Sequence, residues 1–133
     1  MIPELSIVVP VFNEEDSLPV LYGEVVAALA HFDAAWELIL VDDHSSDASL
    51  KVMLALRERD RRVKVLHFRR NFGQTAALAA GFEHARGATV VTMDGDLQND
   101  PADIPRLVAR LAEGFDIVAG WRKSRQDGLF LRK

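Results

Sequence analysis

Short apolar runs alternate with longer amphipathic segments along most of the chain, and no other feature of the sequence constrains the fold as strongly. The apolar runs show little polar alternation, which is typical of strands that are buried on both faces. Strands that alternate with helices favour a mostly parallel, three-layer α/β sheet with right-handed crossovers. We predict strands at residues 5–12, 36–43, 63–68, 88–94 and 115–120.

Helices are predicted between these strands, where apolar residues recur at helical spacing. The first runs from Ser17 to about His31, with Pro19 in its first turn, where proline is tolerated. Residues 74–85 form a helix rich in small residues, which can lie close against a sheet. The helix between them has cap candidates at Ser45, Ser46 and Asp47. Its inner face is formed by Leu50, Met53 and Leu54. The last has its N-cap at Asp100, followed by Pro101, Asp103 and a buried face of Ile104, Leu107, Val108 and Leu111.

Composition limits the class of protein. The 133 residues suffice for one domain with a hydrophobic core, and a hydrophobic content of 49% excludes a disordered chain. Cysteine is absent, which excludes disulfides and thiolate metal sites and fits a reducing compartment.

Charge is distributed unevenly along the chain. The net charge is −4, but residues 121–133 carry +4, so the remaining residues carry −8. An acidic body argues against nucleic acid as a partner of the whole domain. The basic end could contact phosphates or an anionic membrane surface, or it could be a solvated terminus. We therefore separate a main domain, residues 5–122, from a basic tail, residues 123–133.

Polar side chains follow every predicted strand, and in parallel α/β sheets ligands bind beyond the carboxyl ends of the strands. Helix capping explains some of these residues, but it does not account for all five strand ends together. The residues are Phe12 to Asp16, Asp42 to Ser45, Arg69 to Phe72, Asp94 with Asp96 and Gln98, and Trp121 to Lys123.

Asp94 and Asp96 leave the fourth strand one residue apart, so their carboxylates can point the same way and repel each other. A divalent cation such as Mg²⁺ or Mn²⁺ would offset that repulsion, because it binds oxygen ligands and bridges to phosphate oxygens. Gly95 between them lets a ligand approach the backbone closely. The alternative is a loop in which one aspartate forms a turn and the other a cap.

Five motifs in this order together resemble the glycosyltransferase family 2 enzymes, over nearly the whole chain. Within that family they are similar to the polyprenyl-phosphate sugar transferases, the dolichol-phosphate mannosyltransferase-like group and its bacterial undecaprenyl-phosphate relatives. Each motif is weak alone, but five in register are specific. The motifs are SIVVPVFNEEDSLP, LILVDDHSSDAS, FRRNFGQTAALAAGFEHARG, VVTMDGDLQNDPADIP and DIVAGWRKSRQD.

The resemblance implies a GT-A, Rossmann-like nucleotide-sugar-binding fold, with the donor-binding domain at residues 5–122. It places the base and ribose pocket at Pro10, Phe12, Glu14, Val41 and Asp43. The family often has Tyr where this chain has Phe12, which keeps a stacking ring and loses a hydroxyl group.

The resemblance also implies a metal and diphosphate site. Asp94 and Asp96 would be the family's D-x-D pair, with Gly95 between them and Gln98 as a further contact to Mg²⁺ or Mn²⁺. Arg122 would reach the donor diphosphate and, with the two aspartates, form the catalytic set.

The activity implied is inverting transfer of a sugar from a UDP- or GDP-sugar to a polyprenyl phosphate. A metal and Arg122 would stabilise the diphosphate leaving group, so no acid is needed to protonate it. A lipid phosphate is already ionised and needs little help from a general base. Since family members continue beyond this length, we expect the basic tail to lead to an acceptor and membrane region, at the cytoplasmic face of the membrane.

Other interpretations remain open from the sequence. The chain could be a non-catalytic nucleotide-sugar-binding fragment, with weak transfer or none. A receiver-like signalling domain is also acidic at its strand ends, but it lacks a D-x-D followed by Gln. Self-association could cover the C-terminal edge. The sugar, the nucleotide and the acceptor are not determined by these motifs.

Overall fold

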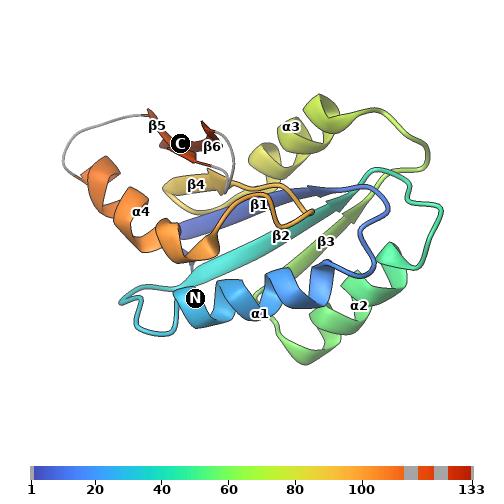
Figure 1. Ribbon diagram of the computed structural model, residues 1–133, viewed down its shortest axis with the longest axis horizontal. Helices are drawn as coiled ribbons and strands as arrows, with labels where there is room; N and C mark the ends of the chain where they lie inside the picture. The colour runs from blue at the N-terminus through green and yellow to red at the C-terminus, as the bar shows by residue number, and fades with distance from the viewer. Residues whose placement is uncertain (1, 113–116, 122–125, 133) are drawn as a thin grey trace.

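The computed structural model describes residues 2–112, 117–121 and 126–132. Its strands form a six-stranded sheet in the order β3-β2-β1-β4-β6-β5 (Figure 1). Strands β3, β2, β1 and β4 are parallel, whereas β6 is antiparallel to both β4 and β5. The strands are β1 (Leu5–Val11), β2 (Trp36–Asp42), β3 (Val63–His67), β4 (Thr89–Thr92), β5 (Ile117–Trp121) and β6 (Gln126–Arg132).

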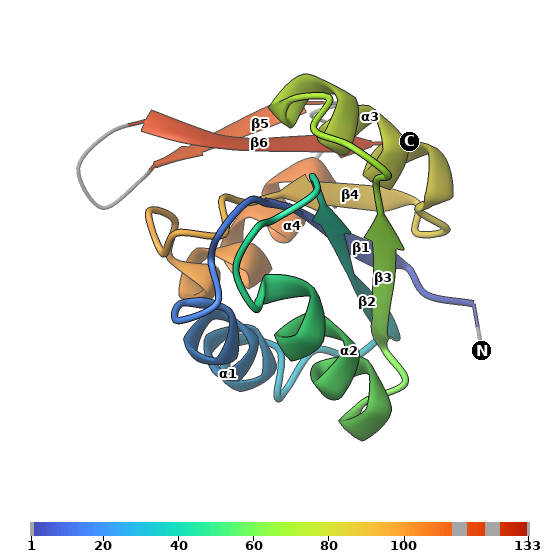
Figure 2. The ribbon, with the colours of Figure 1, turned by 90° about the vertical axis from the view of Figure 1, so that its right-hand side faces the viewer.

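Helices cover both faces of the sheet, which confirms the predicted three-layer α/β class. Helices α1, α2 and α4 lie on one face and α3 lies on the other (Figures 1 and 2). A short 3-10 turn, η1 (Pro101–Asp103), precedes α4. The helices are α1 (Leu18–Ala28), α2 (Ser49–Arg59), α3 (Gln74–His84) and α4 (Ile104–Ala112).

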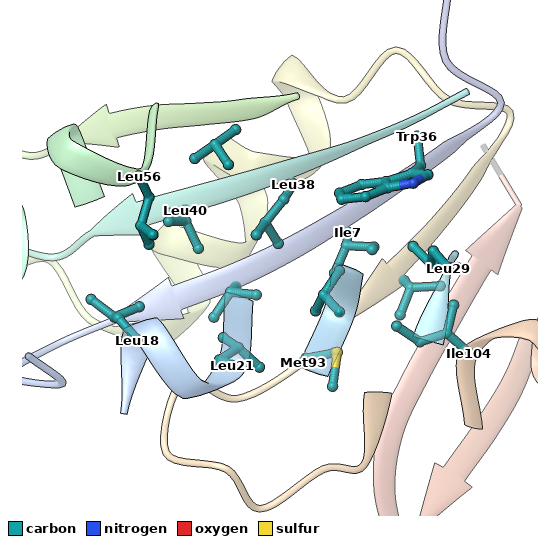
Figure 3. Packing of buried hydrophobic residues seen from close by; sticks show 14 of the residues in the cluster. Ile7, Leu18, Leu21, Leu29, Trp36, Leu38, Leu40, Leu56, Met93 and Ile104 are labelled. Atoms are coloured by element: carbon teal, nitrogen blue, oxygen red, sulfur yellow. The ribbon is translucent and has the colours of Figure 1, made fainter. Parts of the chain in front are cut away.

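The two central strands explain the continuous apolar runs of the sequence. Alternate residues of a strand point to opposite faces, and both faces of β1 and β2 are covered. Ile7 and Leu38 pack toward α1 and α4 (Figure 3), whereas Val8 and Ile39 pack toward α3. Burying a side chain of this size stabilises the fold by about 1.5–3 kcal/mol.

Helix α3 lies close to the sheet because small residues face it, as predicted. Ala77 and Gly81 are its buried positions. A Cβ atom added at Gly81 would overlap the side chain of Val8 in β1 and lie 3.3 Å from Cγ2 of Val41 in β2. Glycine is therefore required at this position for the observed distance between α3 and the sheet.

Strand β6 was not predicted from the sequence. Residues 123–133 were assigned to a basic tail, but Gln126–Arg132 pairs with both β4 and β5 inside the sheet. The predicted boundary after residue 122 therefore falls between two strands of one sheet. The net positive charge of residues 121–133 dominated the interpretation, and the pairing with β4 depends on residues about forty positions away in the chain.

The helix starts were predicted with mixed success. Asp100 caps η1, since its Oδ1 accepts a 3.0 Å hydrogen bond from the Ala102 backbone N–H, as expected. The prediction for α2 was wrong in detail, because Ala48 is the N-cap residue and Leu56 rather than Leu54 is buried. Ser45 instead accepts a hydrogen bond from the loop after β1.

Within the described residues, no helix has the length and apolar composition needed to cross a membrane.

Candidate functional site

A cleft of about 360 Å³ opens at the carboxyl end of the parallel strands. The loops after β1, β2 and β3 gather at this end of the sheet, on the right of Figure 1. Residues from these loops and from the loop after β4 line it, which matches the predicted edge. The lining residues are Pro10, Val11, Phe12, Glu14, Asp43, Asn71, Gly73, Gln74, Asp94, Gly95 and Asp96.

The loop after β1 is fixed by the loop after β2. Asn13 has a φ of 54°, a left-handed conformation in which asparagine is tolerated. Its Oδ1 accepts a 2.8 Å hydrogen bond from the backbone N–H of Ser46, and its own N–H donates to Ser45 Oγ at 2.9 Å. Phe12, which precedes it, is 47% exposed at the cleft. A large apolar ring is thus held on a rigid loop, open to a ligand.

Asp43 anchors the loop after β3. It is only 5% exposed. Its carboxylate accepts hydrogen bonds from the backbone N–H groups of Phe72, at 2.7 Å, and Gly73, at 3.0 Å. A third comes from Asn71 Nδ2 at 3.0 Å. Gly73 has a φ of 99°, which only glycine adopts readily. The structure therefore uses Asp43 to shape the cleft wall at Asn71 and Gly73.

The backbone around the two aspartates is held by buried polar contacts. Asn99 is 7% exposed, and its Oδ1 accepts a 2.7 Å hydrogen bond from the backbone N–H of Asp94. Ser17 Oγ donates a 2.6 Å hydrogen bond to the Gly95 carbonyl. A Cβ atom at Gly95 would lie 3.3 Å from the Pro10 carbonyl oxygen, so the loop packs tightly on the end of β1.

The two carboxylates have different contacts. Asp94 Oδ1 accepts a 3.3 Å hydrogen bond from Gln74 Nε2, which comes from the first turn of α3. Asp96 Oδ1 accepts one at 3.2 Å from the backbone N–H of Gln98, two residues later. Asp96 is exposed on its loop. Both side chains line the cleft, so both are accessible to a ligand there.

Negative charge accumulates in this part of the cleft. Burial raises the pKa of Glu14, and the negative charges of Asp96, Asp47 and Asp94 raise it further, while the hydrogen bond from Ser17 opposes the rise. Repulsion among the carboxylates is therefore present in the protein without a ligand. A cation bound in the cleft would remove it.

The oxygen ligands of the cleft fit a divalent cation that is bound partly by the protein and partly by a substrate phosphate. Asp94 and Asp96 offer carboxylate oxygens, which Mg²⁺ and Mn²⁺ prefer. In the described part of the chain, no three His, Cys, Asp or Glu side chains converge closely enough to hold a metal ion by themselves. Magnesium is commonly bound by one or two carboxylates together with substrate phosphates and water, so two aspartates are sufficient.

Most of the predicted site residues meet at this cleft, although their roles remain predictions. The exceptions are Val41 and Gln98. Val41 is fully buried between β2 and α3, away from the cleft, because its position in β2 points it to the α3 face. Gln98 does not line the cleft either. Arg122 lies outside the described residues. Those that do line it are Pro10, Phe12, Glu14, Asp43, Asp94, Gly95 and Asp96.

Sequence reasoning missed several residues of the site. Asn71, Gly73 and Gln74 line the cleft but were not assigned to it, although Asn71 was noted at a strand end. Their position directly after the third strand was the available signal. Asn99 had no such signal, because its contact with Asp94 depends on the fold of the intervening turn.

Comparison with known proteins gives a consistent picture. The family model described as glycosyl transferase family 2 matches residues 6–133. The chain is 52% identical over 132 residues to dodecaprenyl-phosphate galacturonate synthase of Rhizobium johnstonii, covering 98% of this chain and 39% of that protein. It is 48% identical to undecaprenyl-phosphate 4-deoxy-4-formamido-L-arabinose transferase of Salmonella paratyphi A, covering 97% and 40%. The chain thus spans about two fifths of these relatives.

Solved structures share the fold. Glucosyl-3-phosphoglycerate synthase from Mycobacterium tuberculosis, in complex with UDP, has a TM-score of 0.73 at 21% identity over 98% of this chain and 57% of its own. Mannosyltransferase PcManGT from Pyrobaculum calidifontis, in complex with GDP-Man and Mn²⁺, has a TM-score of 0.67 at 22% identity, covering 90% and 35%. These glycosyltransferases confirm the predicted GT-A class of fold.

Proposed function

Since the chain belongs to glycosyl transferase family 2, we propose that it is the nucleotide-sugar-binding part of an inverting glycosyltransferase. The enzyme transfers a sugar from a UDP- or GDP-sugar to a polyprenyl phosphate. One observation carries the proposal: an exposed aromatic ring, Phe12, and two aspartates, Asp94 and Asp96, share one cleft at the carboxyl edge of the sheet. A nucleoside diphosphate has the matching parts, a flat base and a charged pyrophosphate.

The donor lies across the cleft in this proposal. Phe12 stacks against the base or ribose, and Pro10 forms the floor beside it. The loop held by Asp43 closes the same side, with Asn71 Oδ1 as an acceptor for the base or ribose, since Nδ2 of this residue donates to Asp43. The pyrophosphate lies toward Asp94 and Asp96. In this arrangement, the residues after β1, β2 and β3 position the base, and the residues after β4 position the phosphates.

Asp94 and Asp96 would hold a divalent cation, Mg²⁺ or Mn²⁺, which would supply electrostatic stabilisation for the diphosphate leaving group. Gln74 keeps Asp94 oriented through its hydrogen bond. Asn99 holds the backbone of the same residue in place. Arg122 is proposed to contact the diphosphate as well, on the basis of the family motif. Together these groups stabilise the negative charge that develops on the diphosphate during transfer.

The names of the matched relatives support a lipid-phosphate acceptor. Both names specify a polyprenyl phosphate, dodecaprenyl or undecaprenyl. A phosphate acceptor is ionised near neutral pH, so the transfer can proceed as a single displacement without a dedicated base. We propose that the complete enzyme acts on this acceptor at the cytoplasmic face of the membrane, and that self-association of the chain covers the C-terminal edge of the sheet.

A second interpretation is that this chain binds nucleotide sugars without transferring them. This second interpretation is retained because the chain covers only about two fifths of the length of its relatives. A transfer assay with undecaprenyl phosphate and several nucleotide sugars separates the two, because turnover requires a functional acceptor site. The receiver-like alternative is wrong, because the family model matches residues 6–133.

Calorimetry with UDP and with GDP, each with and without Mn²⁺, tests the proposal. We expect one nucleotide to bind at least about tenfold more tightly with Mn²⁺, which corresponds to about 1.4 kcal/mol. The variant Asp96→Ala should lose this gain. Asp33→Ala is the matched control, since Asp33 is an exposed acid outside the cleft lining. Binding that ignores Mn²⁺, or an Asp96→Ala variant with unchanged affinity, would refute the proposal.

A further inference from the structure

A second cavity lies at the opposite end of the sheet from the cleft, at the amino ends of β2 and β3. Its volume is about 230 Å³. Four of its lining side chains are cationic, Arg61, Arg62, Lys64 and Arg86, and Glu37 is the acidic one. Pro3, Ala35 and Trp36 complete the lining. A concave surface with this charge attracts anions.

The aromatic side of this cavity is rigid. The Arg62 guanidinium lies 4.0 Å from the centroid of the Trp36 ring. The same guanidinium donates two hydrogen bonds to Asp60, from Nε at 3.0 Å and from Nη2 at 2.8 Å. Asp60 also accepts a 2.7 Å hydrogen bond from the hydroxyl of Tyr22. Arg62 is therefore held in one orientation and forms a fixed wall of the cavity beside the other cations.

The Glu37 carboxylate does not compete with an anionic ligand for the cations. It is buried, and its Oε2 accepts hydrogen bonds from Ser6 Oγ at 2.6 Å and from the backbone N–H of Arg86 at 2.8 Å. Its other oxygen, Oε1, lies 3.9 Å from Arg86 Nε. The carboxylate therefore fixes the backbone of Arg86 and engages only Nε of its side chain, so it leaves the terminal nitrogens of Arg86 to a ligand.

Three of the cations keep unused donors. Lys64 Nζ donates to the Arg61 carbonyl at 3.2 Å, which leaves two of its three N–H groups free. Among the residues that the structure describes, the Arg86 guanidinium forms one ion pair, through Nε, so both of its terminal nitrogens keep their N–H donors. Across residues 2–112, no hydrogen bond or ion pair joins the Arg61 guanidinium to another group. These donors can all serve an anion at the same place.

An apolar cavity of about 370 Å³ adjoins this basic one. The two cavities share Glu37, Lys64 and Arg86. The second is otherwise lined by Ile39, Leu66 and His84, on the side of the sheet that α3 covers. A ligand whose charged group lies between Lys64 and Arg86 would therefore reach an apolar surface with the rest of its structure.

We infer that these adjoining cavities form a binding site for an amphipathic phosphate, a phosphate group carried on a short apolar chain. Arg61, Lys64 and Arg86 bind the phosphate oxygens, and Ile39 and Leu66 contact the apolar part. The site is separate from the donor cleft and does not depend on the proposed function. A membrane lipid and a soluble phosphorylated metabolite share this chemistry, so the test must distinguish the two sources.

The test is an NMR titration of ¹⁵N-labelled chain with inorganic phosphate and with dihexanoylphosphatidic acid below its micelle concentration. We expect both to shift the amides of Lys64 and Arg86, with the amphiphile binding more tightly. Arg61→Gln/Lys64→Gln should weaken both by about tenfold, since exposed charge-assisted hydrogen bonds are lost. Leu66→Gln should weaken only the amphiphile.

The double variant Lys51→Gln/Arg57→Gln is the matched control, because it removes the same charge from exposed positions of α2. Its affinities should stay within about twofold of the unaltered chain, as expected for distant surface charges. Dispersed amide spectra will show that each variant is folded. Equal loss in the control, no loss in Arg61→Gln/Lys64→Gln, or equal binding of phosphate and amphiphile overturns the inference.

Vesicles of phosphatidylcholine with and without phosphatidylglycerol distinguish the sources. Sedimentation with the anionic vesicles that is lost in Arg61→Gln/Lys64→Gln identifies a membrane lipid as the ligand. Binding of the monomeric amphiphile without vesicle binding identifies a soluble metabolite. Binding to neither overturns the inference.

Discussion

The Asp43 carboxylate accepts a 2.7 Å hydrogen bond from the backbone N–H of Phe72, so the end of β2 determines the position of the loop after β3. Two further donors, the backbone N–H of Gly73 and Nδ2 of Asn71, occupy the other carboxylate oxygen. The residue predicted to contact the base or ribose is thus also the residue that builds the wall of the cleft. Asp43 can therefore affect nucleotide binding through the loop that it holds.

Asp43→Asn should loosen this loop, because an amide NH₂ group would replace one of the two acceptor oxygens. Leaving a buried N–H unpaired costs about 1–3 kcal/mol. We expect faster hydrogen exchange at the Phe72 and Gly73 amides together with weaker nucleotide binding. Asp33→Asn, at an exposed position, controls for the charge. Unchanged exchange with weaker nucleotide binding would instead assign Asp43 a direct contact only.

Asn99→Ala should impair the proposed metal site more than Gln98→Ala. Asn99 accepts the hydrogen bond from the Asp94 backbone and is nearly buried. The Gln98 side chain makes no hydrogen bond within the described residues. We expect Asn99→Ala to lower stability by about 1–3 kcal/mol and to reduce the Mn²⁺-dependent gain in nucleotide affinity. Thermal unfolding and calorimetry measure the two effects. A larger loss in Gln98→Ala would support the predicted metal contact of Gln98.

Asp60 should make stability depend on acid pH. Hydrogen bonding to Arg62 lowers the pKa of Asp60 most, burial opposes this, and the Tyr22 hydroxyl lowers the pKa further. A depressed pKa means that the ionised carboxylate stabilises the folded state above the unfolded pKa, about 4. This stabilisation is lost as pH falls through the folded value.

The difference in unfolding free energy between the unaltered chain and Asp60→Asn is the measurement for this effect. It should be constant from about pH 7 to about pH 5 and shrink below about pH 4. A difference that stays constant down to the acid limit of folding would contradict the assignment.

Gly81→Ala and Gly23→Ala should have opposite effects. A Cβ at Gly81 meets the Val8 side chain, and overpacking of this kind costs about 1–3 kcal/mol. No atom lies within 4 Å of a Cβ added at Gly23, in the interior of α1. Alanine there should stabilise the protein by about 0.4–1 kcal/mol. Urea unfolding of both variants measures the difference, and destabilisation by Gly23→Ala would be inconsistent with the open space around it.

The sequence identified much of the fold because the relevant signals are local. The apolar runs at residues 36–43 and 63–68 correspond closely to Trp36–Asp42 and Val63–His67. Asp100 was recognised as a cap from its neighbours alone. The edge of the sheet that carries the cleft followed from the parallel topology, so Phe12 and Asp96 were placed at it correctly.

Other features depend on residues that are distant in the chain. Val41 was assigned to the donor site by its place in a motif, but the side of β2 that faces α3 buries it. Strand β6 exists through pairing with β4 and β5, which no short segment encodes. Asp43 as an anchor and Asn99 as a support both act on atoms brought near by folding.

By itself, therefore, the sequence determined the parallel strands, the helices between them and the residues that emerge at the carboxyl edge, since periodicity and capping act over a few residues. Only the tertiary structure decided which carboxylates face a ligand and which hold a loop, and that cations from β3 and from the loop after α3 share a cavity. Those outcomes depend on the distances between residues that are tens of positions apart, and the fold sets these distances.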